Sequence, residues 1–308
     1  MGKKTEIVVG KTKLTVSNLE KVLYPDVGFT KAQVIDYYMR IAPVLLPHLH
    51  DRPITLKRYP DGVNGFFFYE KQCPSHRPSW IETTQVPSRR KEGKIDYCMM
   101  NDLPALVWAA NLADLELHTF LHRAPAITRP TALAFDLDPG PPADIVLCCQ
   151  VGLWLRAIFD RLELQSFPKT SGSKGLQVFV PLNVATTYEK TKPFALALAQ
   201  RLEREHPDLV VSRMQKALRK GKVLIDWSQN DEHKTTVNVY SLRAKATPTV
   251  STPLQWSEVE SVAKKGDSGR LAFESEAVLK RVKKQGDLFE PLLTLKQRLP
   301  SLRKLDAI

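Results

Sequence analysis

Two carboxylates stand close together near the middle of the chain, in the stretch LAFDLDPG, where Asp136 and Asp138 interrupt an apolar run that ends at Pro139-Gly140. Side chains alternate between the two faces of an extended strand, so the two acids would share one face. Paired carboxylates repel each other unless a positive charge lies between them, and their oxygens suit a divalent ion. The spacing therefore favours a Mg²⁺ or Mn²⁺ site, although Asp-Pro-Gly is also common in plain turns.

A third carboxylate strengthens this interpretation. Asp226 follows the apolar run VLI at residues 223–225, which predicts a second strand that ends in an acid. Three carboxylates at the ends of two strands are enough to hold a pair of metal ions on a triphosphate. The predicted chemistry is therefore phosphoryl or nucleotidyl transfer.

A loop rich in serine, glycine and lysine lies between these two strands, in the stretch KTSGSKGLQVFVPL at residues 169–182. Glycines allow successive backbone N–H groups to converge on an anion, while Ser171 and Lys174 add a hydroxyl and a positive charge. The loop is not a Walker A motif, because GxxxxGK followed by Ser or Thr is absent. On a chain that also carries three strand-end acids, it favours binding of a nucleoside triphosphate.

The charge of the chain indicates a polyanionic partner. Lys and Arg number 45 against 33 Asp and Glu, which gives a formal net charge of +12 and a pI near 9.5. Nucleic acid is the first candidate and an anionic membrane surface the second. No apolar run approaches the roughly 20 residues needed to span a bilayer, and the start MGKKTEIVVG lacks the apolar stretch of a secretion signal. A cytoplasmic protein is expected.

The cysteines indicate reduced thiols. Cys73, Cys98, Cys148 and Cys149 form no CxxC pair, and the last two are adjacent. The histidines likewise form no His-x-x-x-His pair. A reduced compartment without structural zinc is the simplest interpretation, so the metal site is expected to consist of carboxylates.

Hydrophobic periodicity predicts the segments that must position these groups. Thr30 is a suitable N-cap for a helix over residues 31–49. Residues 103–121 are predicted to form an amphipathic helix that ends near the tripeptide ELH. A lone histidine after an apolar helix, such as His118, is more often structural than catalytic.

Two further predicted strands, over residues 54–62 and 65–72, carry a run of aromatic residues, FFFY at 66–69. Because successive strand residues point to opposite sides, at least one ring is expected on the surface. Stacking on a base and burial between two packed faces are both open for these rings. The tip SRRKEGK, at residues 88–94, is typical of a solvated hairpin end but also suits contact with a phosphate backbone.

In order and spacing, four motifs resemble the polymerase domain of bacterial ATP-dependent DNA ligase D, a member of the archaeo-eukaryotic primase superfamily. These motifs are FDLDPG, KTSGSKGL, IDWSQN and YSLRAK. Shorter matches extend the similarity across roughly residues 12–300: NLEKVLYP, TKAQVIDYY, RPITLKRYPDG, FYEKQ, PSWI and ELH. The resemblance implies an α/β (α+β) primase-polymerase fold, with an RRM-like catalytic sheet beside an N-terminal α/β module and helices flanking the sheets.

No linker separates two compositionally distinct halves of the chain, which favours one domain over residues 1–308. Within it, the similarity predicts an N-terminal extension over about residues 1–12, a catalytic domain over 13–300 and a tail over 301–308. No KxDG adenylylation motif is found, so a ligase domain is not expected and the polymerase would be free-standing or an excised module.

The resemblance also implies roles for individual residues, carried over by position. The implied catalytic residues and metal ligands are Asp136, Asp138 and Asp226. The implied nucleotide-binding residues are His118, Ser171, Lys174, Gln177, Gln229 and Arg243. The implied DNA-binding residues are Lys21, Lys31, Lys57, Arg58, Phe68, Tyr69, Lys71 and Arg219. Among these, Lys21 and Lys31 match a pocket for the 5′-phosphate at a gap or break, and Phe68 and Tyr69 match aromatics that stack on the template.

One position departs from the pattern of the family. SGGKGLH is usual there, whereas this chain has Ser173 at the second glycine and Gln177 at the histidine. Glutamine donates a hydrogen bond but carries no positive charge and shuttles no proton. The change predicts weaker binding of the triphosphate, or a different preference for metal or nucleotide.

The activity implied by the resemblance is addition of nucleotides, with ribonucleotides preferred over deoxynucleotides, to primer 3′ ends in bacterial non-homologous end joining or gap repair. Mn²⁺ or Mg²⁺ in a two-metal site is the expected cofactor, and nucleoside triphosphates and DNA with 5′-phosphorylated ends are the expected substrates. Ku and a separate ATP-dependent DNA ligase are candidate partners. The expected location is the bacterial cytoplasm, at the nucleoid during repair.

Three other functions remain open from the residues. A stand-alone primase would share the acids but would have no use for a 5′-phosphate pocket. A haloacid-dehalogenase-type phosphatase also has an apolar strand followed by Asp-x-Asp, but it requires Thr or Val where this chain has Gly140. A non-catalytic nucleic-acid-binding module would explain the charge and the aromatics but would leave the three acids unused.

Overall fold

A computed structural model describes residues 4–88 and 92–308 of the chain. Residues 89–91, in the predicted basic tip at 88–94, lie outside the described residues. The chain divides into two compact units, each built from segments that are separated in the sequence. Unit 1 comprises Met1–Pro125, Thr235–Ser251 and Glu274–Gly286, and unit 2 comprises Ala126–Lys234, Thr252–Phe273 and Asp287–Ile308. Within the described part of the chain, no helix is both long and apolar enough to cross a membrane.

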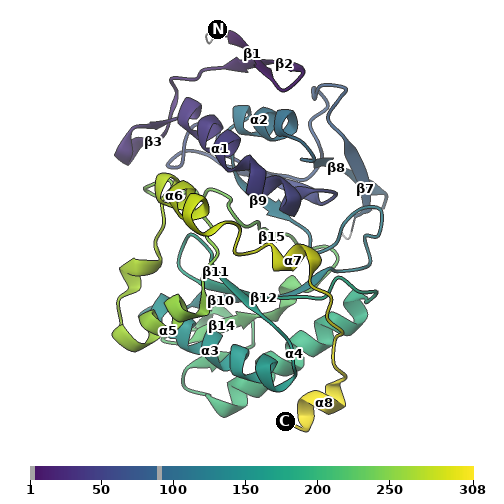
Figure 1. Cartoon of the computed structure of the whole chain (residues 1–308), viewed down its shortest axis with the longest axis vertical. Helices are drawn as coiled ribbons and strands as arrows, with labels where there is room; N and C mark the ends of the chain where they lie inside the picture. Colours follow the sequence, from purple (N-terminus) through teal and green to yellow (C-terminus); the bar gives the residue numbers. More distant parts are fainter. Residues whose placement is uncertain (1–3, 89–91) are drawn as a thin grey trace. The chain divides into compact units, whose positions relative to one another are not determined.

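Unit 2 is built on a five-stranded sheet in the order β11-β12-β10-β14-β13 (Figure 1). Its neighbouring strands are antiparallel, except that β13 runs parallel to β14. The strands are β10 (Ala132–Pro139), β11 (Phe167–Thr170), β12 (Leu176–Pro181), β13 (Val210–Val211) and β14 (Val223–Asp226). The helices are α3 (Ile145–Arg161), α4 (Tyr188–Glu205), α5 (Trp256–Lys265), α7 (Pro291–Thr294) and α8 (Leu302–Asp306).

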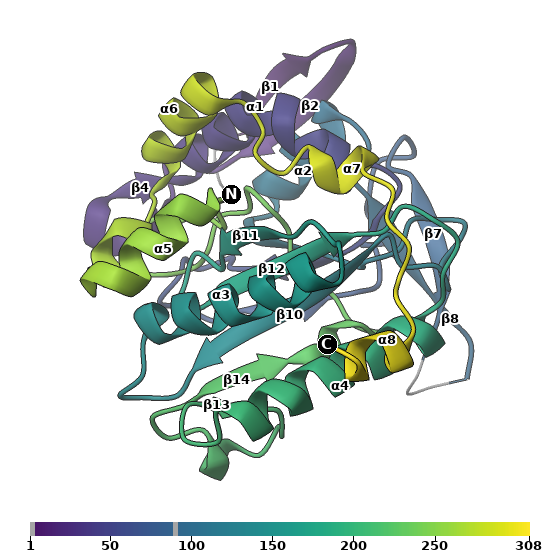
Figure 2. The same ribbon diagram turned by 60° about the horizontal axis from the view of Figure 1, so that its bottom comes forward.

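Strand alternation gives this sheet one apolar face. Leu133, Phe135 and Leu137 of β10 belong to the hydrophobic core that side chains of α3 and α4 complete. Figure 2 shows α3 lying along β10 and β12. Asp136 and Asp138 occupy the alternate positions of β10 and therefore face the opposite side of the sheet. The strand predicted at residues 133–140 is thus confirmed, and the core on one face fixes which way its acids point.

The turn that ends β10 is locked against the segment that precedes β14. The backbone N–H of Gly140 donates to the carbonyl oxygen of Lys222 at 2.8 Å, and that of Gly221 donates to the carbonyl oxygen of Gly140 at 3.0 Å. A Cβ atom at Gly140 would lie 1.8 Å from the carbonyl oxygen of Arg219. Only glycine fits at position 140, because any side chain would collide with the backbone at Arg219. The Asp-Pro-Gly sequence therefore both ends the strand and allows the two backbones to approach closely.

Unit 1 contains a six-stranded sheet, in which β15-β9-β5-β8-β7 are neighbours in this order and β6 also pairs with β5. The strands are β5 (Pro53–Arg58), β6 (Phe68–Glu70), β7 (Thr83–Pro87), β8 (Lys94–Met99), β9 (Asp114–Thr119) and β15 (Thr236–Val237). Two small ladders join β1 (Lys4–Val9) to β2 (Thr12–Ser17) and β3 (Val22–Tyr24) to β4 (Phe29–Thr30). The helices are α1 (Lys31–Leu49), α2 (Leu103–Asn111) and α6 (Ser275–Gln285).

The first helix begins where the sequence predicts. Thr30 is the N-cap of α1 and forms a capping box with Gln33, in which each side chain accepts a hydrogen bond from the backbone N–H of the other residue. The helix covers Lys31–Leu49, as predicted.

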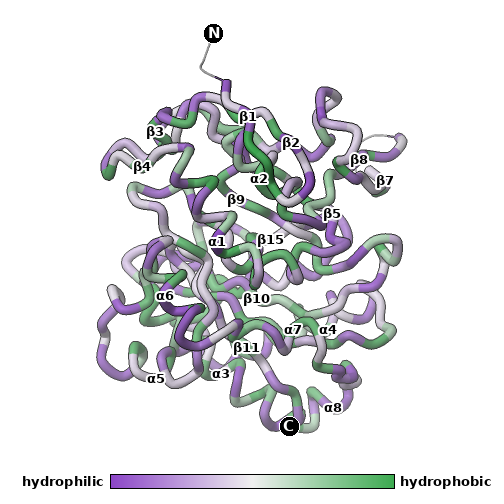
Figure 3. The backbone as a smooth tube through the Cα atoms, turned by 45° about the horizontal axis from the view of Figure 1, so that its top comes forward, coloured by the Kyte–Doolittle hydropathy of each residue, from purple (hydrophilic) through white to green (hydrophobic). Residues whose placement is uncertain are grey.

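The helix predicted over residues 103–121 is wrong in its second half. The segment is markedly hydrophobic over α2 (Figure 3), but α2 ends at Asn111 and Ala113 adopts a left-handed φ of 58°. The chain then enters β9, which lies between β5 and β15 and is buried along nearly all of its length. Residues 114–119, DLELHT, alternate polar and apolar side chains with the period of a strand, but they follow the apolar run of α2 without a Gly or Pro between them. The tripeptide ELH therefore lies on a strand.

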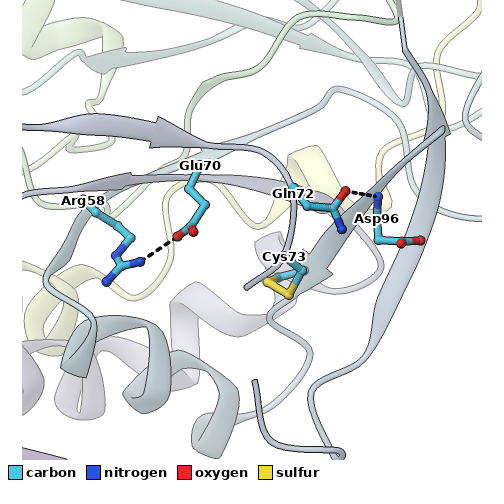
Figure 4. Close-up of a disulfide and its surroundings, with 6 residues drawn as sticks. Arg58, Glu70, Gln72, Cys73 and Asp96 are labelled. Carbon is cyan, nitrogen blue, oxygen red and sulfur yellow. Dashed lines mark hydrogen bonds and ion pairs between the residues drawn. A yellow bond between two sulfur atoms is a disulfide. The ribbon is translucent and has the colours of Figure 1, made fainter. Parts of the chain in front are cut away.

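The expectation of four reduced cysteines is also wrong, because Cys73 and Cys98 form a disulfide (Figure 4). Cys98 belongs to β8, and the segment before Cys73 pairs with the same strand, since the backbone N–H of Asp96 donates to the side chain of Gln72 at 3.2 Å. Residues 25 apart in sequence thus meet through the sheet, which spacing along the chain does not reveal. Cys148 and Cys149 are buried thiols in α3.

The turn at Gly140 gives a test of the packing. Gly140→Ala forces a methyl group into the backbone at Arg219, so the free energy of unfolding should fall by about 1–3 kcal/mol, as for other overpacked sites. Urea denaturation measures the loss. Gly269→Ala is the matched control, because the nearest atom to its Cβ would be 3.6 Å away, on Asp267. Equal midpoints for the two variants would contradict the tight approach of the two backbones.

Candidate active site

A row of polar residues crosses four strands of the sheet in unit 2. Asp136 of β10 lies directly opposite Asp226 of β14 on one side and opposite Gln177 of β12 on the other. Gln177 in turn lies opposite Lys169 of β11. Directly opposed residues share a face, so all four side chains are on the face away from α3 and α4. Two of the three predicted acids are therefore cross-strand neighbours, and Asp138 follows on the same face.

Asp226 is held in place by its own turn. It is the N-cap of a 3₁₀ turn, Trp227–Gln229, and its Oδ1 accepts hydrogen bonds from the backbone N–H and the hydroxyl of Ser228, at 2.9 and 2.6 Å. Its Oδ2 accepts from Nε2 of Gln229 at 3.1 Å. Lys234 donates to the hydroxyl of Ser228. The motif IDWSQN thus orients a carboxylate, and the predicted nucleotide ligand Gln229 contacts that acid.

Electrostatic repulsion is concentrated on Asp136. Burial and the charges of Asp138 and Asp226 raise the pKa of Asp136 to about 7, against a hydrogen bond from Gln177 and the positive charge of Lys169. The buried Oδ1 of Asp136 has no hydrogen-bond partner in the part of the chain that the structure describes. The site therefore has an unsatisfied oxygen and an excess of negative charge.

These residues fit a hard divalent cation. Carboxylate oxygens are the ligands that Mg²⁺ and Mn²⁺ prefer, and an ion would both satisfy the Oδ1 of Asp136 and offset the repulsion. Among residues 4–88 and 92–308, no three His, Cys, Asp or Glu side chains already enclose a metal position. The acids are adjacent in the sheet without forming a closed metal site.

The predicted phosphate loop lies beside Asp138. The hydroxyl of Ser171 accepts hydrogen bonds from the backbone N–H groups of Ser173 and Gly175, at 3.2 and 3.1 Å, so it shapes the loop. A Cβ atom at Gly175 would lie 2.2 Å from the carbonyl oxygen of Leu137 and 3.6 Å from Oδ1 of Asp138. Lys174 is exposed at the loop. The loop backbone at Gly175 therefore lies against β10 beside Asp138, and Lys174 is the residue just before it.

Gln177 connects the acids to a buried lysine. Lys169 is only 1% exposed and donates a hydrogen bond to Oε1 of Gln177. The side chain of Gln177 also donates a hydrogen bond to Asp136. The Lys169 ammonium lies 5.6 Å from the ring centroid of Phe179. Gln177 stands where the family pattern has histidine. It is neutral, and the positive charge near Asp136 comes instead from Lys169, to which Gln177 is hydrogen-bonded.

In unit 1, predicted ligands converge on a residue that the sequence did not single out, Glu116. His118 Nε2 lies 3.0 Å and Arg243 Nε lies 3.3 Å from Oε2 of this carboxylate. Lys57 Nζ lies 3.2 Å from Oε1. The signal available in the sequence was ELH itself, because an acid and a histidine two residues apart share a face only if the segment is a strand. Predicting a helix there concealed Glu116.

The aromatic run lies next to these residues. Phe66, Phe67 and Tyr69 are 70%, 46% and 55% exposed, which confirms that the run does not share one core. Tyr69 meets the ring of His118 edge to face at 5.9 Å, and the Lys57 ammonium lies 5.4 Å from the Tyr69 ring centroid.

The other predicted template contacts lie along the same hairpin. The guanidinium of Arg58 lies 5.2 Å from the ring of Phe68 and forms an ion pair with Glu70 at 2.8 Å (Figure 4). Lys71 is exposed. Aromatic rings and cations therefore alternate over this surface of unit 1.

The two predicted phosphate-pocket lysines are brought together by the β3–β4 ladder. The backbone N–H of Lys31 donates to the carbonyl oxygen of Lys21 at 2.8 Å. Lys31 is buried and its ammonium donates to the carbonyl oxygen of Ser17 at 2.6 Å, whereas Lys21 pairs with Asp61 at 3.0 Å. Burial and the nearby charges of Lys21 and Arg58 lower the pKa of Lys31 to about 8. Cations gathered so closely favour an anion beside them.

Arg219 differs from the other predicted DNA contacts, because its backbone also has a packing role. Its carbonyl oxygen contacts Gly140, and its guanidinium donates to the carbonyl oxygen of Met214 at 2.6 Å. The segment RMQKALRKGK at 213–222 is therefore a loop with a short 3₁₀ turn at Lys216–Leu218, joined to the end of the acid-bearing strand.

Comparisons with known proteins identify the class. The family model described as LigD, primase-polymerase domain, matches residues 30–289. The multifunctional non-homologous end joining protein LigD of Mycolicibacterium smegmatis is 41% identical over 286 residues, which cover 91% of this chain and 36% of that protein. The bifunctional non-homologous end joining protein LigD of Bacillus subtilis is 30% identical over 275 residues, covering 89% of this chain and 43% of that protein.

A solved structure agrees. The polymerase domain of Mycobacterium tuberculosis ligase D in complex with DNA superposes with a TM-score of 0.85 at 38% identity, and the match covers 92% of this chain and 99% of that chain. The fold is therefore the predicted primase-polymerase fold, and the class is that of nucleotidyltransferases. The chain belongs to the family of LigD primase-polymerase domains. It spans 36% to 43% of the length of the two relatives named above.

Gln177 gives a test of the polar row. In Gln177→Leu, both Lys169 and Asp136 lose a buried hydrogen-bond partner, so the free energy of unfolding should fall by about 1–3 kcal/mol. Gln177→His, which keeps a ring nitrogen for bonding, should lose less. Chemical denaturation compares both with Gln200→Leu, the same change at an exposed position of α4. A loss no larger than in this control would mean that Gln177 does not connect the two charges.

Proposed function

We propose that this protein is a metal-dependent polymerase that adds nucleotides, preferentially ribonucleotides, to primer 3′ ends at gaps and double-strand breaks in DNA. The observation that carries the proposal is the pair of opposed carboxylates, Asp136 and Asp226, with Asp138 beside them and an unsatisfied oxygen between strands. Family membership supports the same activity, because the matched relatives are named as non-homologous end joining proteins.

The three acids would hold Mn²⁺ or Mg²⁺ in a two-metal site. A bound divalent ion would supply Lewis-acid stabilisation of charge at the α-phosphate and would lower the pKa of the primer 3′-hydroxyl. The contribution of the chain is to fix the ligands. Asp226 is oriented by Ser228 and Gln229, and the backbone of β10 sets the distance between Asp136 and Asp138.

Phosphate binding is assigned to groups in each unit. In unit 2, exposed Lys174 and the loop shaped by Ser171 would bind nucleotide phosphates, with Gln229 near the sugar or base. In unit 1, His118 and Arg243 are the proposed phosphate ligands, and both retain partly exposed side chains. Gln177 would contribute to nucleotide binding indirectly, because it holds the ammonium of Lys169 by a hydrogen bond.

DNA binding is assigned to surfaces that combine cations with rings. Phe68 and Tyr69 would stack on template bases, with Lys57, Arg58 and Lys71 on the phosphate backbone. Arg219 would lie near the primer end. Lys21 and Lys31 would bind the 5′-phosphate of a downstream strand, which favours gap filling and end joining over priming.

The cellular setting is part of the proposal. Work in non-homologous end joining requires other proteins that hold and seal the ends, for which Ku and an ATP-dependent DNA ligase are the candidates. The proposed location is the bacterial cytoplasm, at the nucleoid during repair. The phosphatase alternative is excluded by membership of the primase-polymerase family.

The acids give the decisive test of activity. Asp138→Ala removes one proposed metal ligand, so single-nucleotide gap filling with Mn²⁺ should fall by at least about 1,000-fold, equivalent to several kcal/mol of transition-state stabilisation. Duplex binding, measured by fluorescence anisotropy, should stay close to that of the wild type. Asp208→Ala, at an exposed position, is the control and should extend normally. If the wild type inserts no nucleotide with either metal, the protein is a DNA-binding module instead.

The lysine pair gives a separate test. Lys31→Met keeps the buried stem but removes the charge, so the stimulation of gap filling by a downstream 5′-phosphate should fall by about tenfold or more, as expected for a charge-assisted hydrogen bond. Because the pKa of free Lys31 is about 8, the wild-type stimulation should weaken as the pH rises from 7 to 9. Lys13→Ala, exposed on β2, is the control. Equal stimulation in Lys31→Met would remove this residue from the phosphate pocket.

A further inference from the structure

Glu116 is the most highly coordinated buried carboxylate among the groups described above. It lies on β9 with a side chain only 2% exposed. Besides Lys57, His118 and Arg243, it has two more partners: its Oε1 accepts hydrogen bonds from the backbone N–H of Ala244 at 3.1 Å and from the hydroxyl of Tyr59 at 3.4 Å. The donors come from β5, from β9 and from the segment around Arg243, so one carboxylate ties together three separate parts of unit 1.

The charge of this cluster is unbalanced. Glu116 contributes one negative charge, whereas Lys57 and Arg243 contribute two positive charges. Burial lowers the pKa of His118, which disfavours a third positive charge on its imidazole. Burial alone would raise the pKa of Glu116, but the hydrogen bond from His118 and the charges of Arg243 and Lys57 hold that pKa far below its usual range. The carboxylate is therefore ionised, and a net positive charge remains for an anion.

The cations stay accessible although the acid does not. The side chains of Lys57, His118 and Arg243 are 12%, 13% and 17% exposed, against 2% for Glu116. A carboxylate beneath such groups limits their rotation without occupying the exposed side that a ligand would contact. It also reduces the mutual repulsion that would otherwise drive the cations apart.

Asp114 is a second buried acid on β9, and its surroundings differ from those of Glu116. It stands two residues before Glu116, is fully buried, and accepts one hydrogen bond from the backbone N–H of Lys57 at 2.7 Å. Burial raises the pKa of Asp114 well above its usual value, and its Oδ2 has no hydrogen-bond partner within the described residues. Burial therefore disfavours the charged form of Asp114, whereas Glu116 is stabilised as a carboxylate by Lys57, Arg243 and the hydrogen bond with His118.

We propose that Glu116 is a positioning residue for nucleotide binding, which holds His118 and Arg243 in the orientation that contacts the triphosphate. The inference rests on the proposed function, and it adds a residue that touches neither the nucleotide nor a metal. The alternative is that Glu116 only stabilises unit 1. The two roles predict different kinetics, because a positioning residue affects the KM for nucleotide, whereas a structural residue lowers the amount of folded enzyme.

Glu116→Gln tests the inference. The amide keeps the shape of the side chain but removes the charge, so the KM for the incoming nucleotide in gap filling should rise by about tenfold or more, with kcat per folded molecule changed by less than about threefold. The affinity for gapped DNA should change less than the KM. Asp114→Asn is the matched control: it alters a buried acid on the same strand whose hydrogen bond is to the backbone N–H of Lys57 and not to His118 or Arg243, so its KM should equal that of the wild type.

Two further measurements keep the test decisive. Glu116→Asp retains the charge at a shorter reach, so it should give an intermediate KM, and it replaces Glu116→Gln if that variant fails to fold. Direct binding of a fluorescent ATP analogue to Asp138→Ala protein, with and without Glu116→Gln, reports affinity in the absence of turnover. The second substitution should weaken this binding by about the same factor as the KM.

The outcomes separate the inference from the proposed function. A wild type that fills gaps, with unchanged KM in both Glu116 variants, overturns the positioning role and leaves the polymerase intact. An equal rise in KM for Asp114→Asn also overturns it, because disturbance of β9 would then suffice. If the wild type neither binds nor inserts nucleotide, the proposed function fails and the inference fails with it.

Discussion

Repulsion between carboxylates on the central strands of unit 2 is the constraint on which the site depends. Asp136 and Asp226 are directly opposed in an antiparallel ladder, an arrangement that is unfavourable without compensation. The register is nevertheless fixed, because a shift of one residue would place the acids in the core formed by Leu133, Phe135 and Leu137. Burial of the apolar face of the sheet thus stabilises the strand register, although this register places two carboxylates opposite each other on the polar face. Gln177 and the charge of Lys169 offset part of the repulsion, and the rest remains available to a cation.

Unit 1 shows the opposite imbalance. Its cluster around Glu116 has more positive than negative charge, and burial together with the charges of Lys21 and Arg58 lowers the pKa of Lys31. Each unit therefore carries charge that it does not neutralise internally, negative on the sheet of unit 2 and positive in unit 1. The carboxylates of unit 2 thus favour a cation, and the cluster of unit 1 favours an anion. The net charge of +12 therefore conceals a local site of the opposite sign.

Much of this arrangement could be predicted from local patterns. Alternation placed Asp136 and Asp138 on one face, and the N-cap at Thr30 located a long helix to the residue. One failure was local: residues 114–119 alternate polar and apolar side chains as a strand does, and the apolar run of α2 just before them concealed this period. The other failures depended on tertiary context. The disulfide between Cys73 and Cys98 requires that two segments meet across a sheet. The importance of Glu116 depends on Arg243, which lies 127 residues further on (243 − 116).

The interleaving of the two units has a consequence for synthesis on the ribosome. Unit 1 needs the segment that ends at Gly286, so 161 residues (286 − 125) must be added after Pro125 before it is complete. At about 5–20 residues per second, this takes roughly 8–32 s. For the first 112 of these residues (237 − 125), β9 lacks its partner β15, and its edge is open to pairing with other strands. Unit 2 likewise needs its last segment, Asp287–Ile308, so neither unit can be completed before residue 286 has been synthesised.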